Sequence, residues 1–270
     1  MVVQHNLTAM NANRQLSGVT SAQAKSTEKL SSGYRINRAA DDAAGLSISE
    51  KLRSQIRGLD KAASNSQDGI SLVQVAEGAL NETHSILQRM NELATQAAND
   101  TNTSTDRASI QKEMDQLTSE IDRIRSTTQF NSMNLLDGTF KNMKLQVGAL
   151  SGQSIVISID NMNASSLKIS GLKVSSFSSA GKAMTAIQKA INSVSVQRSK
   201  LGAIQNRLEH TINNLNTTSE NTSAAESRIR DVDMATEMVE YSKNNILAQA
   251  GQSMLAQANQ SNQGVLSLLQ

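Results

Sequence analysis

The sequence predicts a mainly α-helical protein. Long antiparallel helices form a rod-like bundle with a small β-hairpin region, and the helices at the two ends of the chain pair as a coiled coil. Three observations support this fold class. The 270 residues include no Pro, the residue that interrupts helices. Apolar residues recur at steps of three and four along most of the chain, as on one face of a helix. Aromatic residues make up only 2%, so the core must be narrow and filled by aliphatic side chains.

The composition argues against several classes of function. The net charge is +2, with no basic block and few aromatic side chains to stack on bases, which argues against a nucleic-acid partner. The absence of Cys excludes disulfides, thiolate metal sites and a Cys nucleophile. No stretch approaches the roughly 20 apolar residues that span a membrane. The N-terminus has neither the charged start nor the apolar run of a secretory signal peptide.

Residues 3–32 have the spacing of a helix with a thin apolar stripe. Gly18 within it costs about 1 kcal/mol relative to Ala. The helix is therefore predicted to be marginal alone and to need a partner face. Ser31-Ser32-Gly33 is the predicted stop signal. The stripe consists of Val3, Leu7, Met10, Leu16 and Val19.

Two long helical patterns follow. From about 54 to 99, two apolar sets keep near a seven-residue repeat, which predicts a wide buried face that touches two neighbours. The helix from about 105 to 128 is predicted to lie antiparallel against the previous one. Thr103 with Asp106, or Ser104, is predicted to cap it. Its heptad is the clearest in the chain: Ile110, Met114, Leu117, Ile121 and Ile124.

The apolar period changes to two in the middle of the chain, which predicts a β-hairpin region over about 141–175. Apolar residues alternate at 145–149 and again at 155–159, and 167–174 is predicted to add a short strand. A helical pattern returns over about 180–229. Its last part is polar, which a helix supported from outside tolerates.

The C-terminal tail, residues 246–270, is apolar and uncharged, although chain ends are usually polar and frayed. A helical stripe leads into a cluster of large apolar residues. Antiparallel helices bring both chain ends to the same end of a bundle, so the natural partner of the tail is the N-terminal helix or another molecule. The stripe is Ile246, Leu247, Ala250, Met254, Leu255 and Ala258, and the cluster is Val265, Leu266, Leu268 and Leu269.

No catalytic or metal-binding pattern is recognisable, and the protein is predicted to be a non-enzyme without a cofactor. None of the three His residues lies in an H-E-x-x-H pattern. Asp41-Asp42 is interpreted as a charged linker and helix start rather than a paired-carboxylate site, because the helix dipole favours carboxylates there. Methionines on the helix stripes are interpreted as core filling: Met10, Met90, Met114, Met234, Met238 and Met254.

Four stretches resemble bacterial flagellins. In residues 29–46, KLSSGYRINRAADDAAGL, a Leu-Ser-Ser-Gly-x-Arg-Ile-Asn run leads into Asp-Asp-Ala-Ala-Gly-Leu. The other three are FNSMNLLDGTF, SRIRDVDMATEM and the tail, so the resemblance covers roughly 1–140 and 180–270. Large flagellins insert outer domains in the middle, and the span 150–179 is too short for one. The family's Pro before the last Val is missing at Ser261–Gly264, which leaves open whether the tail helix continues.

The resemblance implies a structural subunit of the bacterial flagellar filament, which self-assembles through its terminal helices into a hollow helical polymer for motility. It implies a terminal, inner-core domain of 1–42 and 232–270, and a helical rod of 43–231. We hypothesise that the thin terminal helices are disordered in the monomer and fold when neighbours supply the missing faces. The predicted assembly residues are Leu7, Met10, Leu16, Leu247, Met254, Leu255, Val265, Leu266, Leu268 and Leu269.

The resemblance also implies partners and a location. The chain would be exported by the flagellar type III system without a cleavable signal peptide and would reside in the extracellular filament. A cytoplasmic export chaperone would hold about 234–270, and hook-associated and cap proteins would be further partners. Two rival interpretations remain: a hook–filament junction protein, which shares both end signatures, and a non-flagellar coiled-coil interaction protein, which explains neither the hairpin nor the apolar tail.

A last implication concerns the host innate immune receptor for flagellin, which reads the core helices. Arg89 and Glu113 would supply polar anchors, and Leu93 an apolar knob. In a filament this surface would be buried between subunits, so its primary role would be assembly. The full set of matching residues is Gln88, Arg89, Leu93, Glu113, Ile187 and Ile191.

Overall fold

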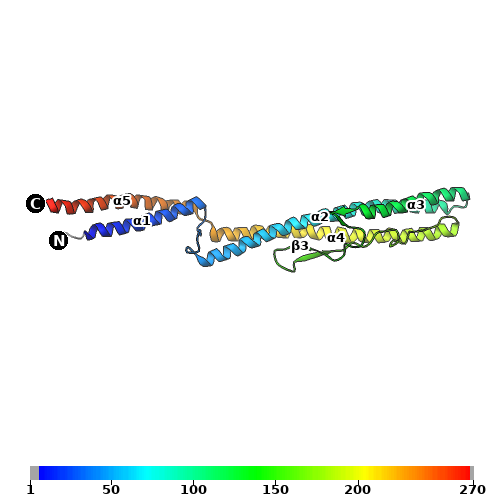
Figure 1. Cartoon of the computed structure of the whole chain (residues 1–270), viewed down its shortest axis with the longest axis horizontal. Coiled ribbons are helices and arrows are strands. Elements are labelled where there is room, and N and C mark those ends of the chain that lie inside the picture. The colour runs from blue at the N-terminus through cyan, green and yellow to red at the C-terminus, as the bar shows by residue number, and fades with distance from the viewer. Residues whose placement is uncertain (1–5, 268–270) are drawn as a thin grey trace. The chain divides into compact units, whose positions relative to one another are not determined.

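The computed structural model describes residues 6–267, and for residues 262–267 the backbone only. The chain is mainly helical, with long helices and a small antiparallel hairpin, which confirms the predicted fold class (Figure 1). The helices are α1 (Leu7–Ser32), α2 (Ala43–Ala97), α3 (Ser104–Thr127), α4 (Phe177–Arg230) and α5 (Met234–Ser267).

The chain divides into two compact units. Unit 1 comprises Met1–Ser54 and Asn221–Gln270, and unit 2 comprises Gln55–Glu220. Unit 1 contains α1 and α5 together with the first residues of α2 and the last residues of α4. Unit 2 contains α3, the strands and the remainder of α2 and α4. Among the described residues, no helix is long and apolar enough to cross a membrane.

The helices begin and end close to the predicted positions, with one exception. α2 begins at Ala43, not near residue 54, because the Asp42 carboxylate accepts a hydrogen bond from the Gly45 backbone N–H at 2.8 Å and caps the helix. α3 begins with the predicted capping box, in which Thr103 and Asp106 bond reciprocally. α5 runs without a break through Ser261–Gly264, so the missing Pro leaves the tail helix continuous.

Four short strands lie between α3 and α4. β1 (Gln129–Phe130) pairs antiparallel with β2 (Met133–Asn134), and β3 (Met143–Gln146) pairs antiparallel with β4 (Ser154–Ile157), which is the predicted hairpin. The strand predicted over 167–174 is wrong. This stretch forms turns and irregular backbone instead. Its apolar residues Leu167, Ile169 and Val174 are buried, because this loop packs their side chains into the core.

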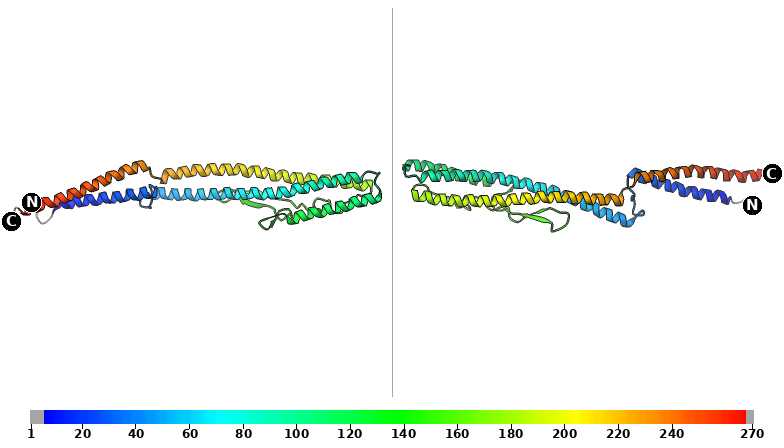
Figure 2. Two further views of the ribbon diagram at one scale, coloured as in Figure 1. Left: turned by 90° about the horizontal axis from the view of Figure 1, so that it is seen from above. Right: turned by 180° about the vertical axis from the view of Figure 1, so that it is seen from behind.

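The core of unit 2 lies where α2, α3 and α4 run side by side and the loop 159–174 covers them (Figure 2). Its largest fully buried side chains come from all three helices and from the connection: Leu80, Leu87, Met90, Met114, Ile121, Ile159, Ile169 and Ile187. The core-filling interpretation is therefore confirmed for Met90 and Met114. It is wrong for Met10, Met234, Met238 and Met254, which are each about half exposed or more.

Candidate assembly surface

Unit 1 is built on one antiparallel helix pair, α1 and α5 (Figures 1 and 2). At one end of the pair, the Asn6 Nδ2 donates a hydrogen bond to the Ala258 carbonyl oxygen at 3.0 Å. At the other end, the Lys29 ammonium contacts the Glu237 carboxylate at 3.1 Å. These two contacts show which residues of α1 lie opposite which residues of α5.

The contact line between the two helices, called the terminal seam below, is made mostly of small or polar side chains. Its buried and half-buried residues recur at steps of three and four, the spacing of a coiled coil. A Cβ added to Gly251 would lie 3.2 Å from the Leu16 Cδ1, so the helices approach closely there. The seam comprises Ala9, Ala12, Leu16, Val19, Gln23, Ser26 and Leu30 on α1, and Glu237, Tyr241, Asn244, Ala248, Gly251, Leu255 and Ala258 on α5.

Most of the large apolar side chains of the pair lie outside the terminal seam. On α5, Val239 and Ile246 are seven residues apart, as are Leu247 and Met254, so these four lie along one side of the helix. Their exposed fractions are 70%, 67%, 46% and 60%. We call the exposed set the outer apolar residues: Leu7, Met10, Met234, Met238, Val239, Ile246, Leu247 and Met254.

The predicted assembly residues therefore divide into groups. Leu16 and Leu255 lie in the terminal seam, half-buried. Leu7, Met10, Leu247 and Met254 are outer apolar residues. Val265 and Leu266 belong to α5, but their side chains are not described, and Leu268 and Leu269 lie outside the described residues.

Sequence reasoning missed most of the small and polar members of the seam. Ala9, Ser26, Asn244 and Ala248 are all buried, with exposed fractions below one tenth. Their heptad spacing could have identified them, whereas considering only large apolar side chains leaves them out.

The two signature motifs of the sequence meet at one joint within unit 1. The Arg35 N–H donates to the Arg230 carbonyl oxygen at 2.7 Å, and the Val232 N–H donates to the Gly33 carbonyl oxygen at 3.0 Å. Gly33 ends α1 with φ 75°, a left-handed conformation that Gly adopts readily. The Arg230 guanidinium lies 4.7 Å from the centre of the Tyr34 ring. The motifs thus tie the end of α1 to the link between α4 and α5.

Charged pairs reinforce this joint. The Arg230 Nη1 donates to the Glu50 carboxylate at 2.9 Å, and that bond lowers the pKa of Glu50. The Lys25 ammonium lies 2.8 Å from the Asp41 carboxylate. With the Arg38 backbone N–H, it lowers the pKa of Asp41 to about 2. Asp41 and the capping Asp42 therefore hold backbone and helix start in place, as the linker interpretation predicted.

The predicted receptor-facing residues lie in unit 2 and separate into surface and core. The Arg89 guanidinium donates two hydrogen bonds to one Glu113 oxygen, at 3.1 and 3.0 Å, and these bonds raise the pKa of Arg89. Gln88 is exposed beside them. Leu93 and Ile187 have exposed fractions of 2% and 0%. Leu93 therefore cannot act as an apolar knob without leaving the core, and Ile191 is only partly exposed.

Within residues 6–267, no group of three or more His, Asp or Glu side chains is arranged to hold a metal ion. The geometry of unit 1 instead offers a surface for association.

Comparison with known proteins gives consistent matches along the chain. The family model for the bacterial flagellin N-terminal helical region matches residues 3–141, and the model for the C-terminal helical region matches residues 184–269. A flagellin of Halalkalibacterium halodurans is 56% identical over 271 residues, and both chains are covered completely. A flagellin of Bacillus subtilis is 53% identical, and both chains are again covered completely, over an alignment of 305 positions. The crystal structure of Bacillus cereus flagellin superposes with a TM-score of 0.52 at 35% identity, covering 60% of this chain and 94% of that one.

Proposed function

Because the chain belongs to the bacterial flagellin family and is a structural subunit of the flagellar filament, not an enzyme, we propose that the outer apolar residues are the surface through which copies join. The filament is extracellular, and the subunit self-assembles into it. The full-length relatives are flagellins, which favours the filament subunit over a junction protein or a non-flagellar coiled coil.

The observation that carries this proposal is the exposure of large apolar side chains on a helix pair whose own contact line is mostly small or polar. Burying a Leu, Ile or Met side chain completely contributes about 1.5–3 kcal/mol. In the helix pair, Ile246 and Met254 remain 67% and 60% exposed. Most of the free energy of burying these two side chains would therefore be gained only on contact with a neighbouring copy. Copies that join without closing a ring form an open helical filament.

The same arrangement supports the proposal that unit 1 folds fully only on assembly. Ordering the backbone costs about 1–2 kcal/mol per residue, and a seam with only four large aliphatic side chains, those of Leu16, Val19, Leu30 and Leu255, returns little of it. The inner-core domain of 1–42 and 232–270 would then be the assembling part, and 43–231 the preformed rod. Circular dichroism of monomer and polymer tests this, because equal helix content in both would exclude coupled folding.

Before assembly, α5 would need protection. The outer apolar residues on it support an export chaperone at about 234–270, with hook-associated and cap proteins as later partners. Deleting 234–270 should abolish both filament growth and chaperone binding. A truncated chain that still polymerised would show that α5 is not the assembly element.

On unit 2, the exposed residues Gln88, Arg89 and Glu113 support a surface that contacts a neighbouring subunit and, in the free monomer, a host receptor. The buried Leu93 and Ile187, with Ile191, would contribute by shaping the helices beneath it. Receptor signalling by Arg89→Ala monomers, compared with polymerisation of the same variant, separates the two roles.

The decisive experiment changes two outer apolar residues. Ile246→Gln with Met254→Gln keeps good helix formers at both positions and removes apolar surface. Losing about 2–3 kcal/mol of burial should raise the critical concentration for polymerisation roughly 30- to 100-fold. The matched control is Val75→Gln with Val196→Gln, two exposed apolar residues of unit 2. It should change the critical concentration much less. Wild-type polymerisation of the first variant would refute the proposal.

A further inference from the structure

Positive charge is concentrated in one stretch of the chain. The whole sequence has 26 basic and 24 acidic residues, but residues 138–208 contain nine basic residues and a single acidic one, Asp160. Eight of the nine basic side chains are exposed, and Arg198 is half-buried. Arg198 is paired with Glu77 of α2 at 3.6 Å and Lys200 with Asp160 at 3.9 Å, and exposed cations among the others attract anions.

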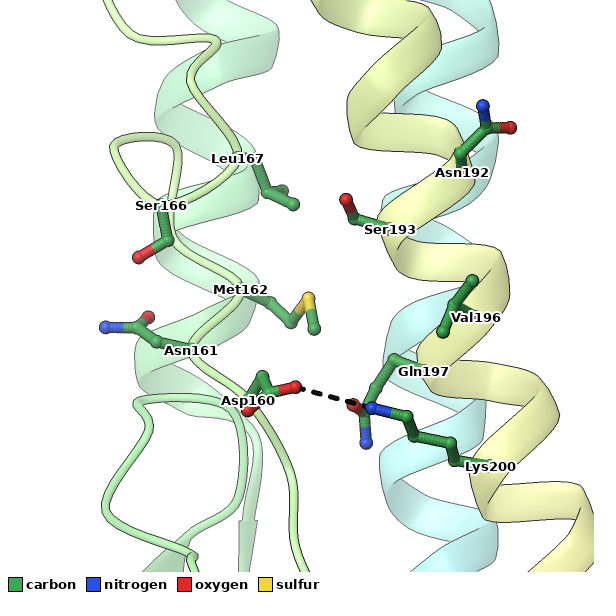
Figure 3. A pocket seen from close by; sticks show the side chains of 10 residues that line it. All are labelled: Asp160, Asn161, Met162, Ser166, Leu167, Asn192, Ser193, Val196, Gln197 and Lys200. Carbon is green, nitrogen blue, oxygen red and sulfur yellow. Dashed lines mark ion pairs between the residues drawn. The ribbon is translucent and has the colours of Figure 1, made fainter.

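Part of this charge lines a groove between the loop 160–168 and α4 (Figure 3). Two adjoining hollows, of about 410 and 520 Å³, share Ser166, Leu167 and Ser193 in their walls. Figure 3 shows Leu167 on the loop facing Ser193 on the helix. The two adjoining hollows are together called the lysine groove below.

Three lysines line the larger hollow: Lys168 from the loop, and Lys182 and Lys189 from α4. Lys182 and Lys189 are seven residues apart, which places them on one face of the helix about 10 Å apart. Among the described residues, none of the three is within ion-pair distance of a carboxylate. The one acidic side chain, Asp160, lies in the other hollow, 3.9 Å from Lys200.

The loop that carries Lys168 is held in place before any ligand arrives. The Ala164 N–H donates to the Asp122 carboxylate of α3 at 3.0 Å, and the Ile169 N–H donates to the Ala164 carbonyl oxygen at 2.9 Å. Lys168 itself has φ 58°, and Ile169 beside it is fully buried. A cation presented on a fixed loop loses little entropy on binding an anion.

We propose that the lysine groove binds an anionic polysaccharide that carries carboxylate or sulfate groups. The three lysines would contact the anionic groups. The Thr185 and Ser193 hydroxyls donate to the Gly181 and Lys189 carbonyl oxygens, so they would accept hydrogen bonds from sugar hydroxyls, together with the Ser166 hydroxyl. None of the described residues lining the two hollows is aromatic, so the stacking platform that single-stranded nucleic acids use is missing.

The groove is expected to face solvent in the filament, a step that rests on the proposed function. The two family models end at residue 141 and resume at residue 184, so Lys168 and Lys182 lie in a segment outside both models. Segments that vary among relatives lie mostly on the surface. A filament would then display the groove once per subunit, and multivalency would raise the avidity.

The test measures binding of a fluorescent heparin hexasaccharide to filaments and to monomers, with uncharged dextran as the ligand control. The groove variant combines Lys168→Gln, Lys182→Gln and Lys189→Gln. The matched control variant removes three exposed lysines outside the groove, by Lys61→Gln, Lys141→Gln and Lys144→Gln. The groove variant should bind heparin about tenfold or more weakly on both monomers and filaments, whereas the control variant should stay within about twofold of the wild type.

Three results would overturn the proposal. Equal weakening in both variants would mean a diffuse charge effect. Binding to monomers but not to filaments, or a groove variant that keeps its helix content yet fails to polymerise, would mean that a second copy occupies the groove. Duplex DNA of matched charge binding as tightly as heparin would exclude a polysaccharide-specific site. Because the monomer titration does not need filaments, failure of assembly cannot be mistaken for failure of the groove.

Discussion

Two glycines of α2 test how closely the β3–β4 hairpin packs on that helix. Gly58 and Gly78 both lie inside the helix, where Gly costs roughly 0.5–1 kcal/mol relative to Ala. A Cβ at position 78 would meet no atom within 4 Å, so Gly78→Ala should stabilise unit 2 by about that amount. A Cβ at position 58 would lie 2.9 Å from the Ala149 Cβ and 3.3 Å from its Cα. Rotating a side chain moves neither atom, so the loop after β3 must shift.

Overpacking a fitted contact costs about 1–3 kcal/mol, which matches or exceeds the gain in helix propensity. Gly58→Ala should therefore lower the unfolding free energy or leave it unchanged, and should be about 1–3 kcal/mol less stable than Gly78→Ala. A change of 1 kcal/mol shifts Tm by about 2–4 °C in a domain of this size. Thermal unfolding followed by far-UV circular dichroism resolves such a difference.

A second substitution tests whether contact with Ala149 causes the loss of stability. Ala149→Gly removes the nearer of the two atoms, so adding it to Gly58→Ala should recover part of the lost Tm. If Gly58→Ala raised Tm as much as Gly78→Ala, the hairpin would not be held against α2 at this position, and the reasoning would fail.

Three further predictions concern single interactions. The pKa of Asp41 is about 2, below its usual 3.8, so its stabilising effect is present above pH 4 and is lost as the pH falls from about 4 to about 2. Asp41→Asn should lose less stability than the wild type over that range, measured by urea unfolding at stepped pH. Thr103→Ala should lower the unfolding free energy by about 0.5–2 kcal/mol, and Thr103→Ser should largely avoid the loss. Arg89 and Glu113 are 51% and 46% exposed, so a double-mutant cycle should give a coupling of at most about 1 kcal/mol, weaker in high salt. A salt-independent coupling would contradict this estimate.

The start of α2 shows why helix boundaries are harder to predict than helix existence. The apolar stripe begins near residue 56, so periodicity placed the helix start near 54. The helix begins at Ala43, because Asp42 caps it and its first turns pack in unit 1 through Ser49, which is fully buried. Apolar periodicity detects the part of a helix that buries large apolar side chains. A helical turn that buries Ser instead does not contribute to this pattern.

The loop 159–174 shows a second limit. Alternating apolar residues predicted a strand at 167–174, but Ile169 and Val174 enter the core from turns. A short alternating run has the same pattern whether it pairs with another strand or plugs a gap between helices. The lysine groove beside it could not be predicted either, because Lys168 and Lys189 are 21 residues apart and the loop alone brings them to one hollow.

Helical period, caps and signature motifs are local properties, so the long helices, the hairpin and the family could be predicted from the residues alone. Which side of each terminal helix meets the other depends on tertiary packing. Both sides of α5 carry residues at heptad spacing, and size alone favoured Ile246, Leu247 and Met254 as the inner side. The structure places Ala248 and Gly251 there instead, because small side chains let two backbones approach. Most of the large apolar side chains are thereby left exposed.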